Sequence, residues 1–439
     1  MAGIPQLERP LPSQAAGLSP IQLGWLAGSV FVLSAGYGAL MPLLPAWLEP
    51  LMATDGKTGL SRHVGLLSGM YAAGVLVGAP LWGRVSDRRG RRRTLLAGLV
   101  GYVASLLPLL RPDWIGIVGI YVLRAANGFF VAAVVPVVPA VVAEHTPQDL
   151  RARRFAWLGA MSLLGFLFGP GLAATVGSLR RVVESAFGGA PDPMNLVILV
   201  SAALGAVMMF GLAATLSRAS ESVADAVTVP EPGRALAPGL WALNGIVMFV
   251  LAGFELGIVL QGQQHADISP RQISLMFAQC SLVMLAINAL LFFTGLLDRV
   301  AGRSVMCAGF VLAVAGLAML AQHRGDGWMY VGVSLTAAGT GLVLPTVSYL
   351  AAGTSPHRLG AAMGGLAAAA GLGQTLGSAA AGWLFGSAAQ IGFAWLALPL
   401  LATLGVLLAR PAWWSAAAAP HARAFQPPGR VEGRSRQEP

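Results

Sequence analysis

The stretch Gly83-Arg-Val-Ser-Asp-Arg-Arg-Gly-Arg-Arg-Arg93 separates two apolar runs, at about 64–83 and 94–110. Each run approaches the roughly 20 residues that an α-helix needs to cross a bilayer. The stretch therefore predicts a charged hairpin loop between two membrane-spanning helices, with six arginines and one aspartate at a single membrane face.

The spacing of this loop indicates a role beyond charge. An excess of arginine on the cytoplasmic side explains the arginines, but it does not explain the Gly-Asp-Gly spacing. Gly83 allows a helix to end close to a neighbour, and Asp87 is able to pair with arginines or to sit at a helix N-terminus, where the dipole favours an anion. We interpret the loop as a conformational latch, made by Gly83, Asp87, Arg88, Gly90 and Arg91.

The composition of the whole chain is that of a membrane protein. Of its 439 residues, 56% are hydrophobic and 10% are charged, against about a quarter charged in soluble domains. So few charges cannot solvate the surface of a soluble enzyme, and the composition also excludes a fibrous or disordered chain. Basic cytoplasmic loops explain the net charge of +10, so we predict no nucleic-acid partner.

Twelve apolar stretches predict an all-α membrane protein with twelve transmembrane helices in two pseudo-symmetric six-helix bundles. The stretches lie at about 21–47, 64–83, 94–110, 115–142, 154–177, 194–216, 239–262, 271–296, 303–321, 328–351, 359–385 and 390–409. The predicted divisions are a cytoplasmic N-terminal tail (1–20), a first bundle (21–216), a central cytoplasmic loop (217–238), a second bundle (239–410) and a disordered basic C-terminal tail (411–439).

The distribution of basic residues predicts the orientation. With the N-terminus inside, the cytoplasmic segments carry 20 of the 28 Lys and Arg residues, and the outer loops carry 7. Because Lys and Arg accumulate on the cytoplasmic side, we predict a multi-pass protein of a bacterial-type inner membrane with both termini cytoplasmic. The first 19 residues are polar and proline-rich and predict no signal peptide.

Two motifs occur in both halves of the chain. The run P-VVPAVVAEHT-P from residue 136 recurs as P-TVSYLAAGTS-P from residue 345, at an offset of 209, and the Asp-Arg pair of the charged loop recurs at an offset of 211. A six-helix unit duplicated in parallel explains both, and parallel repeats mark a large class of secondary transporters. The predicted latch therefore extends to Asp298, Arg299, Gly302 and Arg303.

Together these residues resemble the major facilitator superfamily, whose loop between helices 2 and 3 reads Gly-x-x-x-Asp-Arg/Lys-x-Gly-Arg-Arg. The resemblance covers about residues 20–410, and further residues place the chain near the drug/proton antiporters, including the tetracycline-efflux branch. It also rests on GYGALMPLLP at 36–45, on Arg124 with Gly128, and on GFLFGPG at 165–171, which looks like a motif associated with exporters. That branch carries an acidic residue in helix 1, whereas Val32–Ala35 contains none. The resemblance implies a central cavity, alternating access and often proton coupling.

Two charged residues lie well inside predicted helices. A charge at the depth of Arg124 costs about 2.5–3.5 kcal/mol on insertion scales, so we predict that it relays proton coupling or holds an anionic substrate group. The alternative is a structural role, paired with Asn127 or with backbone carbonyls. Burial disfavours the charged form of a carboxyl group, which makes Glu255 the candidate proton carrier. The alternative places Glu255 near the outer end of its helix, in contact with water.

Polar residues concentrate in the fourth, seventh, eighth, tenth and eleventh predicted helices, and the resemblance places helices 1, 4, 7 and 10 around the cavity. The predicted cavity residues are Ser34, Tyr37, Asn127, Asn244, Gln261, Gln279, Tyr349 and Gln374. In the helix 5 motif, Gly165 and Gly169 predict close packing against a neighbour, and Pro170 predicts a kink.

No motif predicts catalysis or a cofactor. The chain offers no Ser-His pair and no His-Glu-x-x-His helix, and two cysteines without a histidine inside a span give no metal site. Gly56-Lys57-Thr58 lacks the first glycine of a phosphate-binding loop. We therefore predict neither an enzyme nor a bound cofactor.

The combined expectation is a monomeric secondary transporter that exports a small amphipathic molecule in exchange for protons, by alternating access. Its predicted partners are the small-molecule substrate, protons and the lipid bilayer. The alternatives within transport are export of a native metabolite such as a siderophore and proton-coupled uptake. The alternative outside transport is a membrane sensor or scaffold.

Overall fold

The computed structural model describes residues 18–52, 56–146, 154, 157–171, 192–216, 238–265, 268–322, 325–354 and 359–409. Every regular element within these ranges is helical, which suits a bilayer, because a helix satisfies its own backbone N–H and C=O groups. The predicted tails and central loop lie almost entirely outside the described residues.

The described helices account for the twelve predicted spans. Ten segments are long and apolar enough to cross a membrane. The last of them, Met363–Ala409, runs through most of α14 (Leu359–Ala388) and through α15 (Gly392–Ala409), and a shorter apolar helix occupies Trp157–Gly171. The all-α, twelve-helix prediction is confirmed.

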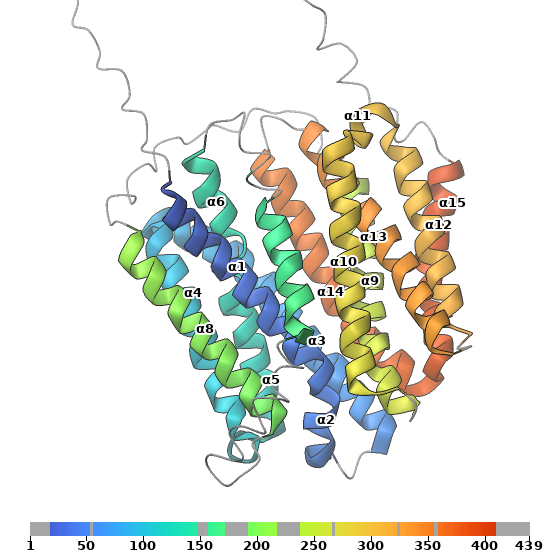
Figure 1. The fold of residues 1–439 in the computed structure, drawn as a ribbon, viewed down its shortest axis with the longest axis horizontal. Coiled ribbons are helices and arrows are strands. Elements are labelled where there is room, and N and C mark those ends of the chain that lie inside the picture. The colour runs from blue at the N-terminus through green and yellow to red at the C-terminus, as the bar shows by residue number, and fades with distance from the viewer. Residues whose placement is uncertain are drawn as a thin grey trace, which may run out of the picture. The chain divides into compact units, whose positions relative to one another are not determined.

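The chain forms two compact units, and the first comprises residues 1–47 and 73–228. In Figure 1, α1, α4 and α8 lie side by side within it, and α5 packs against α4. Its helices are α1 (Pro20–Leu40), the second half of α3 (Gly56–Arg89), α4 (Arg91–Leu106), α5 (Pro112–Val131), α6 (Val137–Glu144), Trp157–Gly171 and α8 (Pro193–Thr215).

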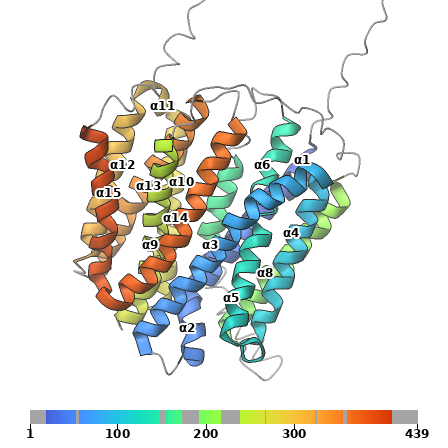
Figure 2. The same ribbon diagram turned by 180° about the vertical axis from the view of Figure 1, so that it is seen from behind.

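The second unit comprises residues 48–72 and 229–439. Figure 2 shows α14 running along α9, and α12 pairs with both α13 and α15. Besides α14 and α15, its helices are the first half of α3, α9 (Pro238–Gln264), α10 (Pro270–Thr294), α11 (Leu296–Arg299), α12 (Gly302–Leu320) and α13 (Asp326–Thr354). The boundary between the units falls inside α3, so residues 48–72 group with the second unit, although the sequence places them in the first bundle.

Proline interrupts two of the predicted helices. The segment expected at 21–47 becomes α1, a 3-10 turn at Met41–Leu43 that contains Pro42, and the short α2 (Leu44–Leu48). The segment expected at 115–142 ends as α5 at Val131, turns through 132–136, and resumes as α6 directly after Pro136. A proline has no N–H to continue the helical hydrogen bonds, so each helix ends ahead of it or tightens around it.

Glycines set the closest helix seams. In the first unit, a Cβ on Gly165 would lie 2.8 Å from Cβ of Ser34 on α1. In the second unit, a Cβ on Gly373 of α14 would collide with the backbone of Gly245 on α9, and a Cβ on Gly382 would lie 2.7 Å from Cα of Gly65 on α3. Small residues let membrane helices approach backbone to backbone, which compensates for the weak hydrophobic drive in lipid.

Candidate functional site

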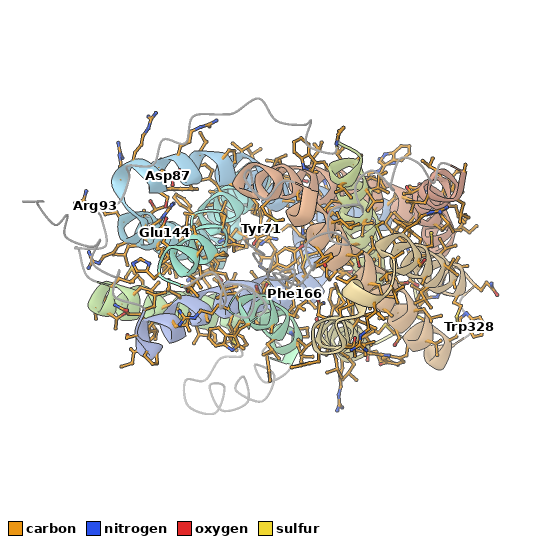
Figure 3. The ribbon with its side chains drawn as sticks, turned by 90° about the horizontal axis from the view of Figure 1, so that it is seen from above. Tyr71, Asp87, Arg93, Glu144, Phe166 and Trp328 are labelled. Atoms are coloured by element: carbon orange, nitrogen blue, oxygen red, sulfur yellow. The ribbon has the colours of Figure 1, made fainter. Side chains whose placement is uncertain are left out.

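Arg91, the first residue of α4, holds the charged loop of the first unit together. Its guanidinium donates from Nε and Nη2 to Oε1 of Glu144, at 3.0 and 2.6 Å, and from Nη1 to Oγ of Ser86 at 2.8 Å. Nη1 also lies 2.7 Å from Oδ1 of Asp87. Figure 3 shows Asp87 and Glu144 close together, at the ends of α3 and α6. One side chain therefore joins three helices through charge-assisted hydrogen bonds.

Gly90 makes the tight turn that places Arg91. Its φ is +93°, a region that side-chain-bearing residues rarely adopt, and it is the single residue between α3 and α4. Its N–H donates to the carbonyl of Ser86 at 3.1 Å, which closes the last turn of α3. The conformational freedom of glycine thus lets the chain reverse within one residue and start α4 on Arg91.

Two other members of the predicted latch, Gly83 and Arg88, lie outside the hydrogen-bond network of Arg91 in the described structure. A Cβ on Gly83 would meet nothing within 4 Å, so the structure shows open space where the sequence suggested a close approach. The physical reason is that α3 does not end at Gly83 but continues to Arg89. Arg88 lies exposed on the last turn of α3.

Sequence reasoning missed Glu144, which is the principal partner of Arg91. It lies 53 residues further along the chain, at the last position of α6. Because it falls just beyond the predicted helix at 115–142, it does not stand out as an intramembrane charge. The available signal was its predicted membrane face: an acidic residue at the same face as six arginines is a candidate partner for one of them.

Arg92, the residue after Arg91, anchors a neighbouring helix, and Arg303 does the same in the second unit. Arg92 donates from Nη2 to the carbonyl of Ala213, near the end of α8, at 2.8 Å. Arg303 donates from Nε and Nη2 to the carbonyls of Leu407 and Leu408, at the end of α15, at 3.1 and 3.3 Å. The last carbonyls of a helix have no partner within the helix, so a guanidinium there satisfies them.

The second charged loop has a different construction. Gly295, with φ +58°, ends α10, and the short α11 follows with Arg299 exposed at its last position. Asp298 lies within α11, and its side chain is outside the described residues. Because α12 begins at Gly302 as α4 begins at Arg91, the counterpart of Arg303 is Arg92, and the position of Arg91 is held by a glycine.

The two predicted intramembrane charges both lie within candidate spans. Arg124 is 3% exposed on α5. Glu255 is half-buried on α9, six residues before the end of its span at Gln261, which corresponds to about 9 Å. No hydrogen bond or ion pair to another described residue holds its carboxyl group.

Three of the predicted cavity residues join helices of the first unit. Oγ of Ser34 lies 2.9 Å from Oγ of Ser162, and the ring of Tyr37 meets that of Phe166 edge-on at 5.4 Å. Both contacts join α1 to the helix Trp157–Gly171. Asn127 on α5 donates to Oγ of Ser105 on α4 at 3.0 Å. These polar groups therefore stabilise helix seams.

The predicted cavity residues of the second unit divide into two kinds. Asn244 donates to the carbonyl of Leu366 at 2.8 Å, and Gln279 donates to Oγ of Ser334, so both join neighbouring helices. Gln261 is fully buried, and its Oε1 accepts no hydrogen bond within the described part of the chain. Tyr349 is 38% exposed, and Gln374 is half-buried on α14.

The helix 5 motif packs against α1. A Cβ on Gly169 would lie 2.7 Å from the carbonyl oxygen of Ala35, and the ring of Pro170 lies near Gly38. Pro170 is the second-last described residue of its helix, so the segment in which a kink would show lies outside the described residues. In the described ranges, no group of three or more His, Cys, Asp or Glu side chains is placed to hold a metal ion.

A chain of apolar spanning helices, with charged loops at their ends and ionisable groups within two spans, is that of a multi-span membrane protein. The model of the Major Facilitator Superfamily matches residues 26–262 and 240–435. The chain belongs to this superfamily, and it is a transporter.

Several similar proteins are named for drug resistance. The chain is 26% identical to the tetracycline resistance protein, class B, of Escherichia coli over 336 residues, which cover 75% of this chain and 80% of the relative. It is 26% identical to the class D protein of Salmonella ordonez over 399 residues, covering 86% and 94%. It is 24% identical to multidrug resistance protein 2 of Bacillus subtilis (strain 168), covering 61% and 64%.

Solved structures share the fold at low identity. The partially occluded, inward open xylose transporter XylE from E. coli matches with a TM-score of 0.70 at 13% identity, covering 89% of this chain and 98% of that one. The human organic anion transporter MFSD10 matches with a TM-score of 0.66 at 19% identity, covering 89% and 100%. These similarities establish the fold of a major facilitator.

Proposed function

We propose that the protein exports a small amphipathic, drug-like molecule in exchange for protons. The relatives named for tetracycline and multidrug resistance support this substrate class. The motif GFLFGPG at 165–171 supports export over uptake.

The proposal rests on the position of Glu255 within a membrane span. Among the described residues it is the one acidic residue that lies more than four residues from both ends of a candidate span. An ionisable group at such a depth is expensive and is retained for function. A half-buried carboxyl group that no hydrogen bond holds in the described structure is free to bind and release a proton, whereas a carboxylate locked in an ion pair is not.

The proposed mechanism is alternating access, in which protonation of Glu255 and binding of substrate compete. Arg124, buried within α5, couples the two events. The loop that carries Asp87 and Arg91 holds one conformation of the cytoplasmic side, and the loop that carries Asp298 and Arg299 contributes to the same control.

The test uses the full-length protein in proteoliposomes with an imposed proton gradient, with tetracycline and norfloxacin as the transported compounds. We expect gradient-driven transport by the unmodified protein and its loss in Glu255→Gln, while exchange of labelled compound without a gradient persists. Glu49→Gln changes an exposed acid near a span end and serves as the control.

Two results would contradict the proposal. If Glu255→Gln kept full gradient-driven transport, Glu255 would not be the proton carrier. If neither compound moved and a sugar or siderophore did, the substrate class would be wrong and the direction of flux would decide between export and uptake.

We also propose that the protein is a monomer in a bacterial-type inner membrane, with both termini cytoplasmic. The basic loops support this orientation. Fusion of alkaline phosphatase or a fluorescent protein to the C-terminus tests it, because the phosphatase is active only outside and the fluorescent protein folds well inside. Phosphatase activity would reverse the proposed orientation.

A further inference from the structure

An apolar groove of about 550 Å³ opens on the second unit between α9, α14 and α15. Phe249 of α9 and Ala380 of α14 line it, together with Trp383 of α14 and Trp395 and Pro399 of α15. The two tryptophans are 63% and 55% exposed. The groove is therefore an open, concave surface and not part of the packed core.

A groove of this kind does not stay empty in a membrane. Atoms that line a void lose their dispersion contacts on one side, and the lining offers almost no polar surface to water. Within the hydrocarbon region, lipid acyl chains are the molecules at hand to fill an apolar recess. The lining alone therefore predicts a lipid tail but does not select a headgroup.

Arg62 selects the headgroup, because it places a positive charge beside the groove. It is an exposed residue on the first half of α3, which belongs to the same unit, and its guanidinium carbon lies 5.8 Å from the ring centroid of Trp383. This is a cation–π distance, and it fixes a positive charge at the tryptophan that walls the groove.

The depth of this pair matches the headgroup boundary. Arg62 lies six residues from the start of α3 at Gly56, and Trp383 lies five residues from the end of α14 at Ala388. At 1.5 Å per residue both lie about 7–9 Å from their helix ends. Tryptophan and arginine at this level are typical of the boundary between headgroups and acyl chains.

We propose that the groove binds one acyl chain of an anionic phospholipid, from the leaflet at the N-terminal end of α3, and that Arg62 binds its phosphate. The tail lies between Trp383 and Trp395 and reaches Phe249. The inference concerns the lipid-facing surface and does not depend on the transported substrate or on proton coupling.

The experiment is native mass spectrometry of the full-length protein, released from nanodiscs of equal parts phosphatidylglycerol and phosphatidylcholine. We expect retained phosphatidylglycerol on the unmodified protein and about fivefold less on Arg62→Gln, since one basic residue at the membrane surface contributes about that factor. Ala380→Phe fills the groove while leaving Arg62 in place, and it should remove the same adduct.

Arg111→Gln is the matched control. Arg111 lies 5.7 Å from the ring of Trp114, which is 83% exposed, so it makes the same cation–π contact at a tryptophan that does not line the groove. This variant should retain the lipid. Equal retention of both lipids, or an adduct that survives both Arg62→Gln and Ala380→Phe, would overturn the proposal.

Discussion

The two charged loops begin from similar sequences and are built differently. In the first unit, Arg91 opens α4 and joins Asp87 and Glu144. In the second unit, Gly302 opens α12, and the residue at the repeat offset of 209 from Glu144 is Gly353. The helix-end anchor, in contrast, is present in both, as Arg92 and Arg303.

This difference separates two roles that the sequence motif combines. Arginine bonded to the last carbonyls of a neighbouring helix is a structural device, and both units need it because each contains that helix end. The ion-pair network is described only in the first unit. If it controls a conformational change, that control is asymmetric, although the helices on either side are repeated.

The largest expected effect comes from reversing the central charge. Arg91→Glu places a third carboxylate beside Asp87 and Glu144, so the network repels itself. A loss of about 1.4 kcal/mol in one conformation changes an equilibrium tenfold, and we expect gradient-driven transport to fall by about that factor. The double variant Arg91→Glu/Glu144→Arg should recover part of it, whereas Arg88→Glu, on an exposed side chain of the same loop, should have little effect. No recovery in the double variant would argue against the network.

The next effect tests the turn that places Arg91. Gly90→Ala forces a side chain into φ +93°, which costs about 1–3 kcal/mol, so the thermal unfolding midpoint of the purified protein should fall by several degrees. Ala301 occupies the corresponding position before α12 with φ −55°. Ala301→Gly should leave the midpoint nearly unchanged, and an equal loss in both variants would contradict the assigned asymmetry.

A smaller and symmetric effect is expected for the helix-end anchors. Arg92→Gln and Arg303→Gln each remove hydrogen bonds to terminal carbonyls, with a cost of about 1 kcal/mol. Both should lower the unfolding midpoint by a similar, modest amount. A strong effect of Arg303→Gln on transport rate alone would show that the second loop also acts as a latch.

The smallest effect on transport is expected from giving the second unit the ion pair that Arg91 and Glu144 form in the first. Gly302→Arg with Gly353→Glu supplies the second unit with the charges of the first. An exposed ion pair contributes about 0–1 kcal/mol, so transport should slow by at most a few-fold. High salt should reverse the slowing through screening. Faster transport would contradict a latch.

Sequence alone predicted most of the fold, because the lengths of apolar runs and the scarcity of charge determine a multi-span protein. It failed where local chemistry interrupted a run, as at Pro136, where one expected helix became α5 and α6. The charged loop was found because its residues are adjacent in the chain. Glu144 was missed because its pairing with Arg91 depends on how the helices pack.

The candidate cavity was less predictable for a related reason. Membrane helices are apolar on nearly every side, so the pattern does not mark which face meets a neighbour. Asn127 and Asn244 were placed in a cavity by residue type, and the structure shows each amide bonded across a helix seam. Glu255 and Arg124 were easier to select, because a charge within a span is rare wherever it points.

The glycine seam between α9 and α14 has a consequence for motion. Where Gly373 meets Gly245, the two helices touch backbone to backbone, so no side-chain rotamers lie in the contact. At this point no rotamer freedom is lost, since glycine has none to lose, but Asn244, one residue earlier on α9, donates to the carbonyl of Leu366 on α14. A displacement of α14 along α9 therefore has to break this hydrogen bond, so the amide holds in register two helices that the glycines bring together.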